Sequence, residues 1–171
     1  MLHVYYGDGK GKTTAAIGLA VRALGCGQAV CLVQFLKGRG TGEVDFLEKT
    51  PGITILRGKT ASCFTFQMNE AQKAECAQLQ AEIFDEGLAM ARQGRCNLLV
   101  LDEVLDAVRL GFLPEDALRE LTRQTALAAE VVVTGRGPAP WLLEAADYVT
   151  HMVKEKHPYD RGISARRGVE Y

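Results

Sequence analysis

A glycine-rich segment near the N-terminus, residues 7–14, constrains the fold of this chain more than any other feature. A short β-favouring run, residues 2–6, precedes it, and a helical segment, residues 13–24, follows it before two glycine stop signals. A strand that leads through a glycine-rich loop into a helix is the setting of a phosphate-binding loop, in which backbone N–H groups and the helix N-terminus face an anion. The segment therefore predicts a nucleoside triphosphate site, with MgATP as the ligand.

The loop departs from the strict pattern G-x-x-x-x-G-K-[ST] at one position, because Tyr6 stands where the first glycine is expected. Lys12 is expected to neutralise phosphate charge, and the Thr13 hydroxyl to bind Mg²⁺. The alternative is a glycine-rich turn that only happens to contain lysines. We expect the whole loop to contact ATP, through Gly7, Asp8, Gly9, Lys10, Gly11, Lys12, Thr13 and Thr14.

A second feature, an acidic strand end, supports the same site. The apolar run 98–101 ends in Asp102 and Glu103. Parallel strands present their carboxyl ends to ligands at one sheet edge, where a carboxylate can hold Mg²⁺ directly or through water. The alternative is that these acidic residues only cap a helix. We predict Thr13, Asp102 and Glu103 as the metal site, and Lys12, Thr13 and Glu103 as catalytic residues.

The remaining periodicity predicts alternating strands and helices. Strands are expected at 2–6, 29–36, 53–56, 98–101, 130–134 and 148–153, and further helices at 69–93, 114–128 and 140–146. Strand cores that are apolar throughout are typical of a parallel sheet covered on both faces. The predicted fold is an α/β, P-loop NTPase-like (RecA-like) three-layer sandwich with a mainly parallel central sheet, formed by one domain over residues 1–171.

Composition excludes several classes of protein. The formal net charge of −1 gives no overall field for nucleic acid, so no nucleic-acid partner is expected. The five cysteines form no C-x-x-C pair, and no apolar run is long enough to cross a bilayer. No secretory signal is recognised, so we expect a cytoplasmic protein with no membrane partner. Residues 154–167 form a locally basic run, which is either a solvated tail or a ligand contact.

The motifs together resemble one family, the ATP:corrinoid adenosyltransferases. The loop of residues 7–16 is similar to that family's phosphate loop and shares its departure at the first glycine. Further similar segments follow in family order at residues 33–38, 99–103, 133–137 and 156–171. Members of the family often carry an N-terminal extension that covers the corrinoid across a dimer, whereas this chain begins at its first strand, so we expect closure of the corrinoid site to differ.

The resemblance implies transfer of the 5′-deoxyadenosyl group of ATP to the cobalt of a reduced corrinoid, with Mg²⁺ bound and triphosphate released. It implies that the corrinoid is cobalamin or a precursor such as cob(I)yrinic acid a,c-diamide, that the enzyme is a homodimer, and that a reduced flavin or flavodoxin-type protein donates electrons. Phe64 and Phe66 occupy the family's aromatic-Thr-aromatic segment and are expected to contact the corrinoid, with core filling as the alternative. Arg136 is expected to bind ATP, and Arg161, Arg166 and His157 are further candidates.

Two other functions fit a phosphate loop. A small-molecule kinase on the same fold would release ADP rather than triphosphate. A nucleotide-switched regulatory ATPase would show slow hydrolysis and a partner-dependent conformational change. The nature of the released phosphate compound separates both from adenosyl transfer.

Overall fold

One parallel sheet forms the centre of the protein. The computed structural model describes residues 1–38, 40–58, 68–123 and 129–170. Within these residues the strands follow the order β3-β2-β4-β5-β1-β6, and each adjacent pair is parallel. The strands are β1 (Leu2–Tyr6), β2 (Val30–Gln34), β3 (Ile53–Arg57), β4 (Leu98–Asp102), β5 (Glu130–Gly135) and β6 (Tyr148–His151).

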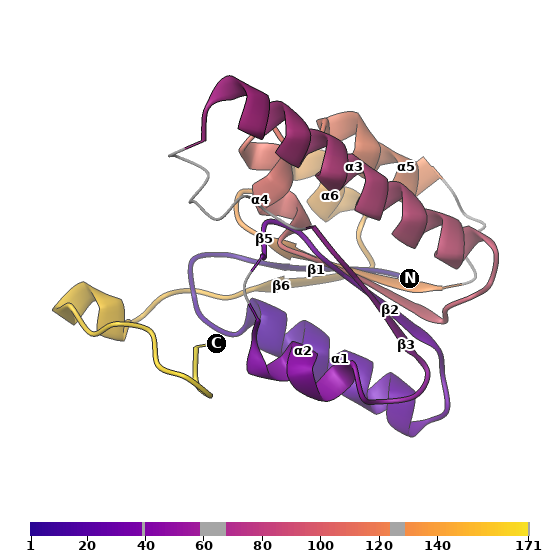
Figure 1. The fold of residues 1–171 in the computed structure, drawn as a ribbon, viewed down its shortest axis with the longest axis horizontal. Coiled ribbons are helices and arrows are strands. Elements are labelled where there is room, and N and C mark those ends of the chain that lie inside the picture. Colours follow the sequence, from indigo (N-terminus) through magenta and orange to yellow (C-terminus); the bar gives the residue numbers. More distant parts are fainter. Residues whose placement is uncertain (39, 59–67, 124–128, 171) are drawn as a thin grey trace.

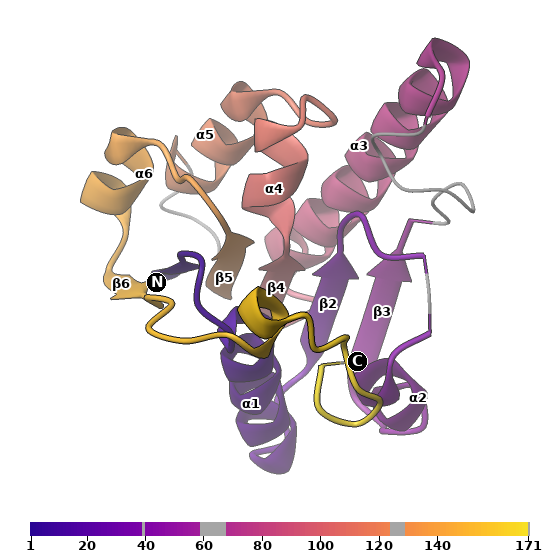
Figure 2. The same ribbon diagram turned by 90° about the vertical axis from the view of Figure 1, so that its left-hand side faces the viewer.

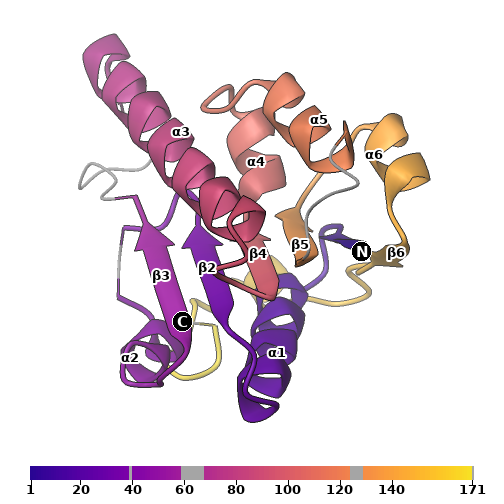
Figure 3. The ribbon, with the colours of Figure 1, turned by 90° about the vertical axis from the view of Figure 1, so that its right-hand side faces the viewer.

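Helices cover both faces of this sheet. Figure 1 shows α1 and α2 on one face and the other four helices on the opposite face, and Figure 3 shows the same layers from the side. The helices are α1 (Lys12–Gly25), α2 (Gly42–Leu47), α3 (Glu70–Arg92), α4 (Val104–Arg109), α5 (Glu115–Arg123) and α6 (Pro140–Ala145). The predicted α/β sandwich with helices on both faces of a parallel sheet is confirmed.

The continuous apolar strands explain why the sheet is covered twice. Successive side chains of a strand point to opposite faces. In β2, Val30 and Leu32 pack with the buried alanines of α1, whereas Cys31 and Val33 pack on the side of α3. All five residues of β2 are buried, and the same holds for β4. A strand of this kind has no polar face to expose, so only a three-layer arrangement buries it fully.

The long helix α3 begins as its sequence predicts. The Asn69 side chain accepts a hydrogen bond from the Gln72 N–H at 2.9 Å, and the Gln72 side chain accepts one from the Asn69 N–H at 2.9 Å. This reciprocal pair is the expected capping box. Gly87 lets the helix approach the sheet closely, since a Cβ there would lie 2.7 Å from Cγ2 of Val33.

Several predicted boundaries were wrong. The strand expected at 29–36 ends at Gln34, because Leu36 adopts a left-handed conformation with φ of 58°. The strand expected to reach residue 153 ends at His151. The helices α2 and α4 were not predicted, since six residues are too few to show a helical period. The helix expected at 114–128 is described only up to Arg123.

The C-terminal segment crosses the end of the sheet rather than extending it. After β6 the chain passes beside the N-terminus of α1 and contains a short 3-10 helix, η2 (Pro158–Arg161), as Figure 2 shows. The segment therefore lies over the loop that joins β1 to α1.

None of the described helices is long and apolar enough to span a membrane.

Candidate active site

Backbone contacts to two other strands hold the glycine loop. Gly7 N–H donates to the carbonyl of Gly135 at the end of β5 (3.2 Å), and Gly9 N–H donates to the carbonyl of Met152 just after β6 (2.8 Å). Gly7 adopts φ of 120° and Gly11 adopts 114°, both in the left-handed region that favours glycine. The loop conformation therefore depends on glycine at these positions.

Close approach adds a second reason for glycine. A Cβ at Gly9 would lie 2.7 Å from the Met152 carbonyl oxygen, and a Cβ at Gly7 would also collide with that oxygen. Gly7 and Gly9 are the two loop positions that the Met152 carbonyl approaches closely. The absence of the first motif glycine at Tyr6 is thus compatible with a tightly anchored loop.

The start of α1 presents an anion-binding end. Gly11 occupies the N-cap position, and within the described chain no side chain caps this helix. The first N–H groups of a helix have no intrahelical partner, and the helix dipole adds positive partial charge there. Lys12 lies at this end, and its ammonium donates to the Gly9 carbonyl at 2.7 Å. Burial, followed by the Arg136 charge, lowers the pKa of Lys12 below its ordinary value.

Asp102 forms the centre of the acidic cluster. Its side chain is fully buried, at 0% exposure. The hydroxyls of Thr13 and Thr134 donate to its Oδ1 at 2.8 Å each, and the Lys37 ammonium donates to its Oδ2 at 2.6 Å. Gln34 Nε2 also donates to Oδ2, at 3.3 Å. A buried carboxylate with this many donors is held in one orientation.

The strand order explains how Thr134 reaches Asp102. β5 lies between β1, which precedes the phosphate loop, and β4, which ends at Asp102. Thr134, near the end of β5 and fully buried, therefore stands beside Asp102. Its hydroxyl also accepts a hydrogen bond from the Glu103 N–H at 2.9 Å. Glu103 adopts φ of 65°, so this bond supports a left-handed turn that directs the next carboxylate to the same edge.

Lys37 neutralises the acidic cluster. Its ammonium lies 2.6 Å from Asp102 Oδ2 and 3.4 Å from Glu103 Oε1. Burial by itself lowers the pKa of Lys37, but the charges of Asp102 and then Glu103 outweigh it, so the net pKa is raised. For Glu103, burial raises the pKa above its ordinary value, and Lys37 opposes that shift. The cluster combines two acidic groups with one partly buried cation.

Arg136, which follows β5, contacts the glycine loop through Asp8. Its Nε is 3.3 Å from Asp8 Oδ1, and its Nη1 is 3.6 Å from Asp106 Oδ1. Arg109 makes a closer contact with Asp106, at 2.9 Å. The guanidinium of Arg136 is half exposed, so it can face a ligand held by the loop.

The donor set suits Mg²⁺. The Thr13 hydroxyl and the Asp102 and Glu103 carboxylates are hard oxygen ligands at one sheet edge, the type that Mg²⁺ takes. Gln34 supports a further polar occupant, because its buried Oε1 has no hydrogen-bond partner among the described residues. The described residues contain no cluster of three His, Cys, Asp or Glu side chains able to hold a metal alone. Phosphate oxygens and water would have to complete the coordination, as they commonly do for Mg²⁺.

The predicted residues do not all converge. Lys12, Thr13, Asp102 and Glu103 meet at the carboxyl edge of the sheet, whereas Lys10 points to the C-terminal segment, 3.9 Å from Glu170. Asp8 and Thr14 are exposed at the rim of the loop. The expected corrinoid residues, Phe64 and Phe66, lie outside the described residues.

The C-terminal candidates His157 and Arg166 contact other residues of the same segment. Arg166 pairs with Glu170 at 3.0 Å, and this pairing holds the pKa of Glu170 at about 2. The His157 ring accepts a hydrogen bond from the Tyr159 N–H at 3.2 Å, which caps η2. In this conformation His157 and Arg166 organise the segment itself.

Sequence reasoning missed four contributors to the site. These are two buried strand-end residues, one loop cation and one backbone carbonyl: Gln34, Thr134, Lys37 and Met152. Gln34, Lys37 and Thr134 belong to segments that were recognised as family-like. The available signal was polar side chains at the ends of apolar strands, which meet at one edge in a parallel sheet.

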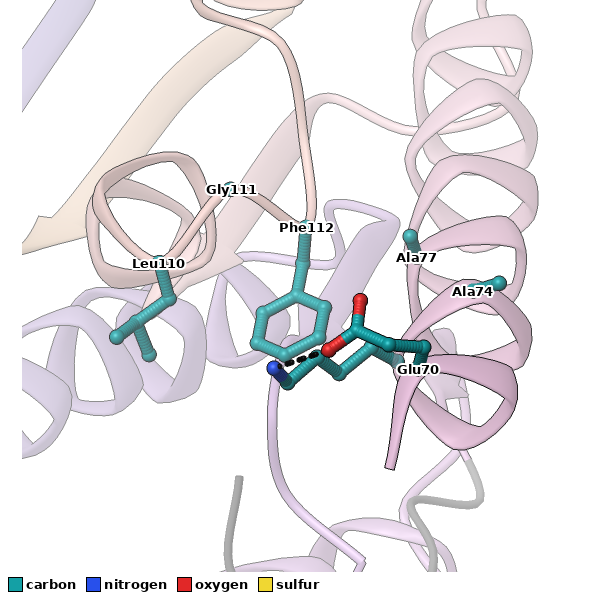
Figure 4. Close-up of a pocket in the computed structure, with 7 residues that line it drawn as sticks. Glu70, Ala74, Ala77, Leu110, Gly111 and Phe112 are labelled. Atoms are coloured by element: carbon teal, nitrogen blue, oxygen red, sulfur yellow. Dashed lines mark hydrogen bonds and ion pairs between the residues drawn. The ribbon is translucent and has the colours of Figure 1, made fainter. Parts of the chain in front are cut away.

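A hollow lies beside the start of α3. It encloses about 520 Å³ and is lined by Glu70, Lys73, Ala74, Ala77, Leu110, Gly111 and Phe112. Figure 4 shows the Phe112 ring beside the ion pair of Glu70 and its lysine partner, which are 2.8 Å apart. Phe112 also packs with Met68 and Cys76. The lining combines apolar side chains with one charged pair, Glu70 and Lys73.

Comparison with known proteins agrees with this geometry. The family model described as ATP:corrinoid adenosyltransferase BtuR/CobO/CobP matches residues 1–171. A corrinoid adenosyltransferase of Pseudomonas aeruginosa is 36% identical over 172 residues, which cover 100% of this chain and 83% of the relative. Corrinoid adenosyltransferases of Escherichia coli K12 and Salmonella typhimurium LT2 are each 34% identical over 98% of this chain and 84% of their own length.

Solved structures support the fold alone. The cytoplasmic domain of EssC aligns with 95% of this chain and 35% of its own, at a TM-score of 0.50 and 12% identity. Identity this low says nothing about substrate, whereas the family match extends over the loop, the acidic strand and the C-terminal segment. The chain belongs to the ATP:corrinoid adenosyltransferase family.

Proposed function

We propose that this protein transfers the 5′-deoxyadenosyl group of MgATP to the cobalt of a reduced corrinoid and releases triphosphate. The observation that carries the proposal is the convergence of Lys12, Thr13 and Asp102 at one sheet edge in a chain of this family. In the reaction the Co(I) electron pair forms a bond to C5′ of ATP. The C5′–O bond breaks, its electrons leave on the triphosphate, and the cobalt becomes Co(III).

The protein's task in this reaction is to bind and stabilise a leaving group. The substrate supplies the nucleophile, so no side chain has to act as a general base. The N–H groups at the start of α1 and the Lys12 ammonium would stabilise charge that develops on the triphosphate. Thr13, Asp102 and Glu103 would hold Mg²⁺, which when bound neutralises further phosphate charge. Holding C5′ in line with cobalt is a positioning effect.

We propose the hollow beside the start of α3 as the corrinoid site. Phe64 and Phe66 precede Met68 and Glu70 in the chain, and Glu70 lines the hollow beside Phe112. The apolar part of this hollow suits the flat, apolar face of a corrin ring. Arg136, half exposed over the loop, would face the triphosphate. We propose that one domain carries all these contacts.

The setting of the reaction is part of the proposal. Cobalamin and a precursor such as cob(I)yrinic acid a,c-diamide both offer the required cobalt. A reduced flavin or flavodoxin-type protein would supply the electrons that form Co(I). We propose that the enzyme works in the cytoplasm as a homodimer.

The direct test is anaerobic incubation with MgATP and chemically reduced cob(I)alamin. Formation of a light-sensitive alkylcobalamin is followed by absorbance, and the phosphate product by chromatography. We expect stoichiometric triphosphate with the wild type and no alkylcobalamin with Lys12→Ala. Release of ADP, or of ADP and orthophosphate alone, would contradict adenosyl transfer and would favour a kinase or a regulatory ATPase.

A further inference from the structure

The Lys37 ammonium lies among the three residues that the site offers to a metal. It is 2.6 Å from Asp102 Oδ2, 3.4 Å from Thr13 Oγ1 and 3.4 Å from Glu103 Oε1. Its side chain is only 19% exposed, and Asp102 is fully buried. One cation thus already contacts an oxygen of each of the three residues of the proposed Mg²⁺ site.

The backbone directs Lys37 to this position. Residue 36 adopts the left-handed conformation, with φ of 58°, and its N–H donates to Gln80 Oε1 at 3.0 Å. Gln80 belongs to α3 and is fully buried. Phe35 N–H continues the pairing with β4 by donating to the Asp102 carbonyl at 2.9 Å. The turn that carries Lys37 is therefore held by the core, and its position is not the result of a freely moving surface side chain.

Two cations cannot share this position. Mg²⁺ binds oxygen at about 2.0–2.1 Å. The same carboxylate oxygen of Asp102 now has an ammonium at 2.6 Å. Placing both cations on this one small cluster would bring like charges within a few ångströms in a poorly solvated place, where repulsion is strong. Metal entry therefore requires Lys37 to leave.

The exchange is unfavourable for a metal that arrives alone. The protein offers one buried carboxylate, one partly exposed carboxylate and one hydroxyl, and Mg²⁺ usually relies on phosphate oxygens for the rest of its coordination. A metal that arrives alone would have to displace the Lys37 ammonium from Asp102 Oδ2 with no phosphate oxygens to complete its own coordination. A metal that arrives with a triphosphate brings the missing oxygen ligands.

We propose that Lys37 is a tethered cation that occupies the divalent-metal position of the nucleotide-free protein, so that metal enters together with the triphosphate and not before it. The inference rests on the proposed MgATP site but not on the fate of the adenosyl group. Lys37 keeps the buried carboxylate paired between turnovers. It also denies a preformed site to free transition metals, many of which bind oxygen and nitrogen ligands more tightly than Mg²⁺.

The test is Mn²⁺ binding to the nucleotide-free protein, measured by electron paramagnetic resonance of free Mn²⁺. Lys37→Met removes the charge but keeps most of the side-chain volume. Lys49→Met is the matched control, because Lys49 is exposed after α2, away from the cluster. We expect Lys37→Met to bind one Mn²⁺ per chain at least tenfold more tightly than the wild type and Lys49→Met. Adding Asp102→Asn to Lys37→Met should abolish the gained site.

Two results would overturn the proposal. One is a wild-type protein that binds one Mn²⁺ per chain without nucleotide as tightly as Lys37→Met does. The other is a folded Lys37→Met, or Lys37→Gln if the methionine variant fails to fold, that gains no Mn²⁺ affinity.

Failure of the adenosyl transfer would be visible separately. The Mn²⁺ titration contains neither nucleotide nor corrinoid, so its result does not depend on which product the enzyme forms. Lys37→Arg keeps a cation at the position and should bind Mn²⁺ as weakly as the wild type. A tight site in Lys37→Arg would count against the role of charge.

Discussion

Replacing Thr134 by valine tests whether this buried hydroxyl holds the acidic turn together. Valine has almost the shape of threonine but no hydroxyl. The change removes the hydrogen bond to Asp102 Oδ1 (2.8 Å) and leaves the Glu103 N–H without its acceptor (2.9 Å). Both groups lie at a site where Thr134 is fully buried, so water cannot readily replace the lost partner.

The expected loss in the free energy of unfolding follows from these two hydrogen bonds. A hydrogen bond to a charged group contributes about 1.5–3 kcal/mol, and an orphaned buried donor costs about 1–3 kcal/mol. Asp102 keeps donors from Thr13, Lys37 and Gln34, which places the first contribution at the low end. We therefore expect Thr134→Val to lower the free energy of unfolding by about 2–4 kcal/mol.

Urea unfolding followed by circular dichroism measures this loss. Thr150→Val on the exposed strand β6 is the matched control and should change stability by less than about 0.5 kcal/mol. Thr134→Ser keeps the hydroxyl and should recover most of the stability. If Thr134→Val unfolds at the wild-type urea midpoint with the same m-value, the hydroxyl does not hold the turn and the reasoning is refuted.

Three further predictions concern the loop and the core. Lys12→Ala should weaken MgATP binding by about tenfold to a hundredfold in calorimetry, because it removes a charge-assisted phosphate contact. It should change stability little, since among the described residues the Lys12 ammonium donates a hydrogen bond to the Gly9 carbonyl alone. Gly9→Ala should cost about 1–3 kcal/mol in urea unfolding, because its Cβ would lie 2.7 Å from the Met152 carbonyl. At pH 8 iodoacetamide should label exposed Cys26 and spare Cys31, since burial raises the pKa of Cys31 to about 12.

Controls make each outcome decisive. Gly18→Ala is the control for the loop glycine, because a Cβ there meets nothing within 4 Å in α1; it should stabilise the protein by up to about 1 kcal/mol. An equal loss in Gly9→Ala and Gly18→Ala would contradict the close approach. Undiminished MgATP affinity in Lys12→Ala would remove that side chain from the phosphate site. Peptide mapping identifies the labelled cysteine, and labelling of native Cys31 as fast as Cys26 would contradict its burial.

The direction in which high pH changes the contribution of Cys31 to stability also follows from its pKa. The folded-state pKa lies above that of the unfolded chain, so folding favours the protonated thiol. This contribution is fully present below the ordinary thiol pKa of about 8.5 and is lost as the pH rises towards about 12. As the pH rises from about 8.5 to about 12, the urea midpoint of the wild type should therefore decrease, and the midpoint of Cys31→Val should decrease less. An equal fall in both proteins would assign the alkaline loss to other groups.

The fold was predictable where the signal is local. The continuous apolar runs indicated strands covered on both faces, and Asn69 with Gln72 indicated where α3 begins. Both signals come from residues close in the chain. The helix α4 gave no such signal, because its six residues follow the left-handed turn at Glu103 and owe their helical state to packing against β5.

The candidate site was predictable in part for the same reason. The glycine loop and the acidic strand end are each continuous in sequence, so their chemistry is visible there. Lys37 lies in a segment of glycines and charges that gives no indication of its partner. Its pairing follows from the parallel register of β2 and β4, which sets Gln34 opposite Asp102.

The amino-acid order alone thus determined a phosphate loop, an acidic partner and a parallel sheet, because glycine spacing and apolar period act over a few neighbouring residues. Only the tertiary structure decided that β5 lies between β1 and β4, which puts Thr134 against Asp102. It also decided that Lys37 faces the proposed metal ligands Asp102 and Glu103. Strand order depends on which faces pack together across the whole chain, and no local pattern encodes those distant contacts.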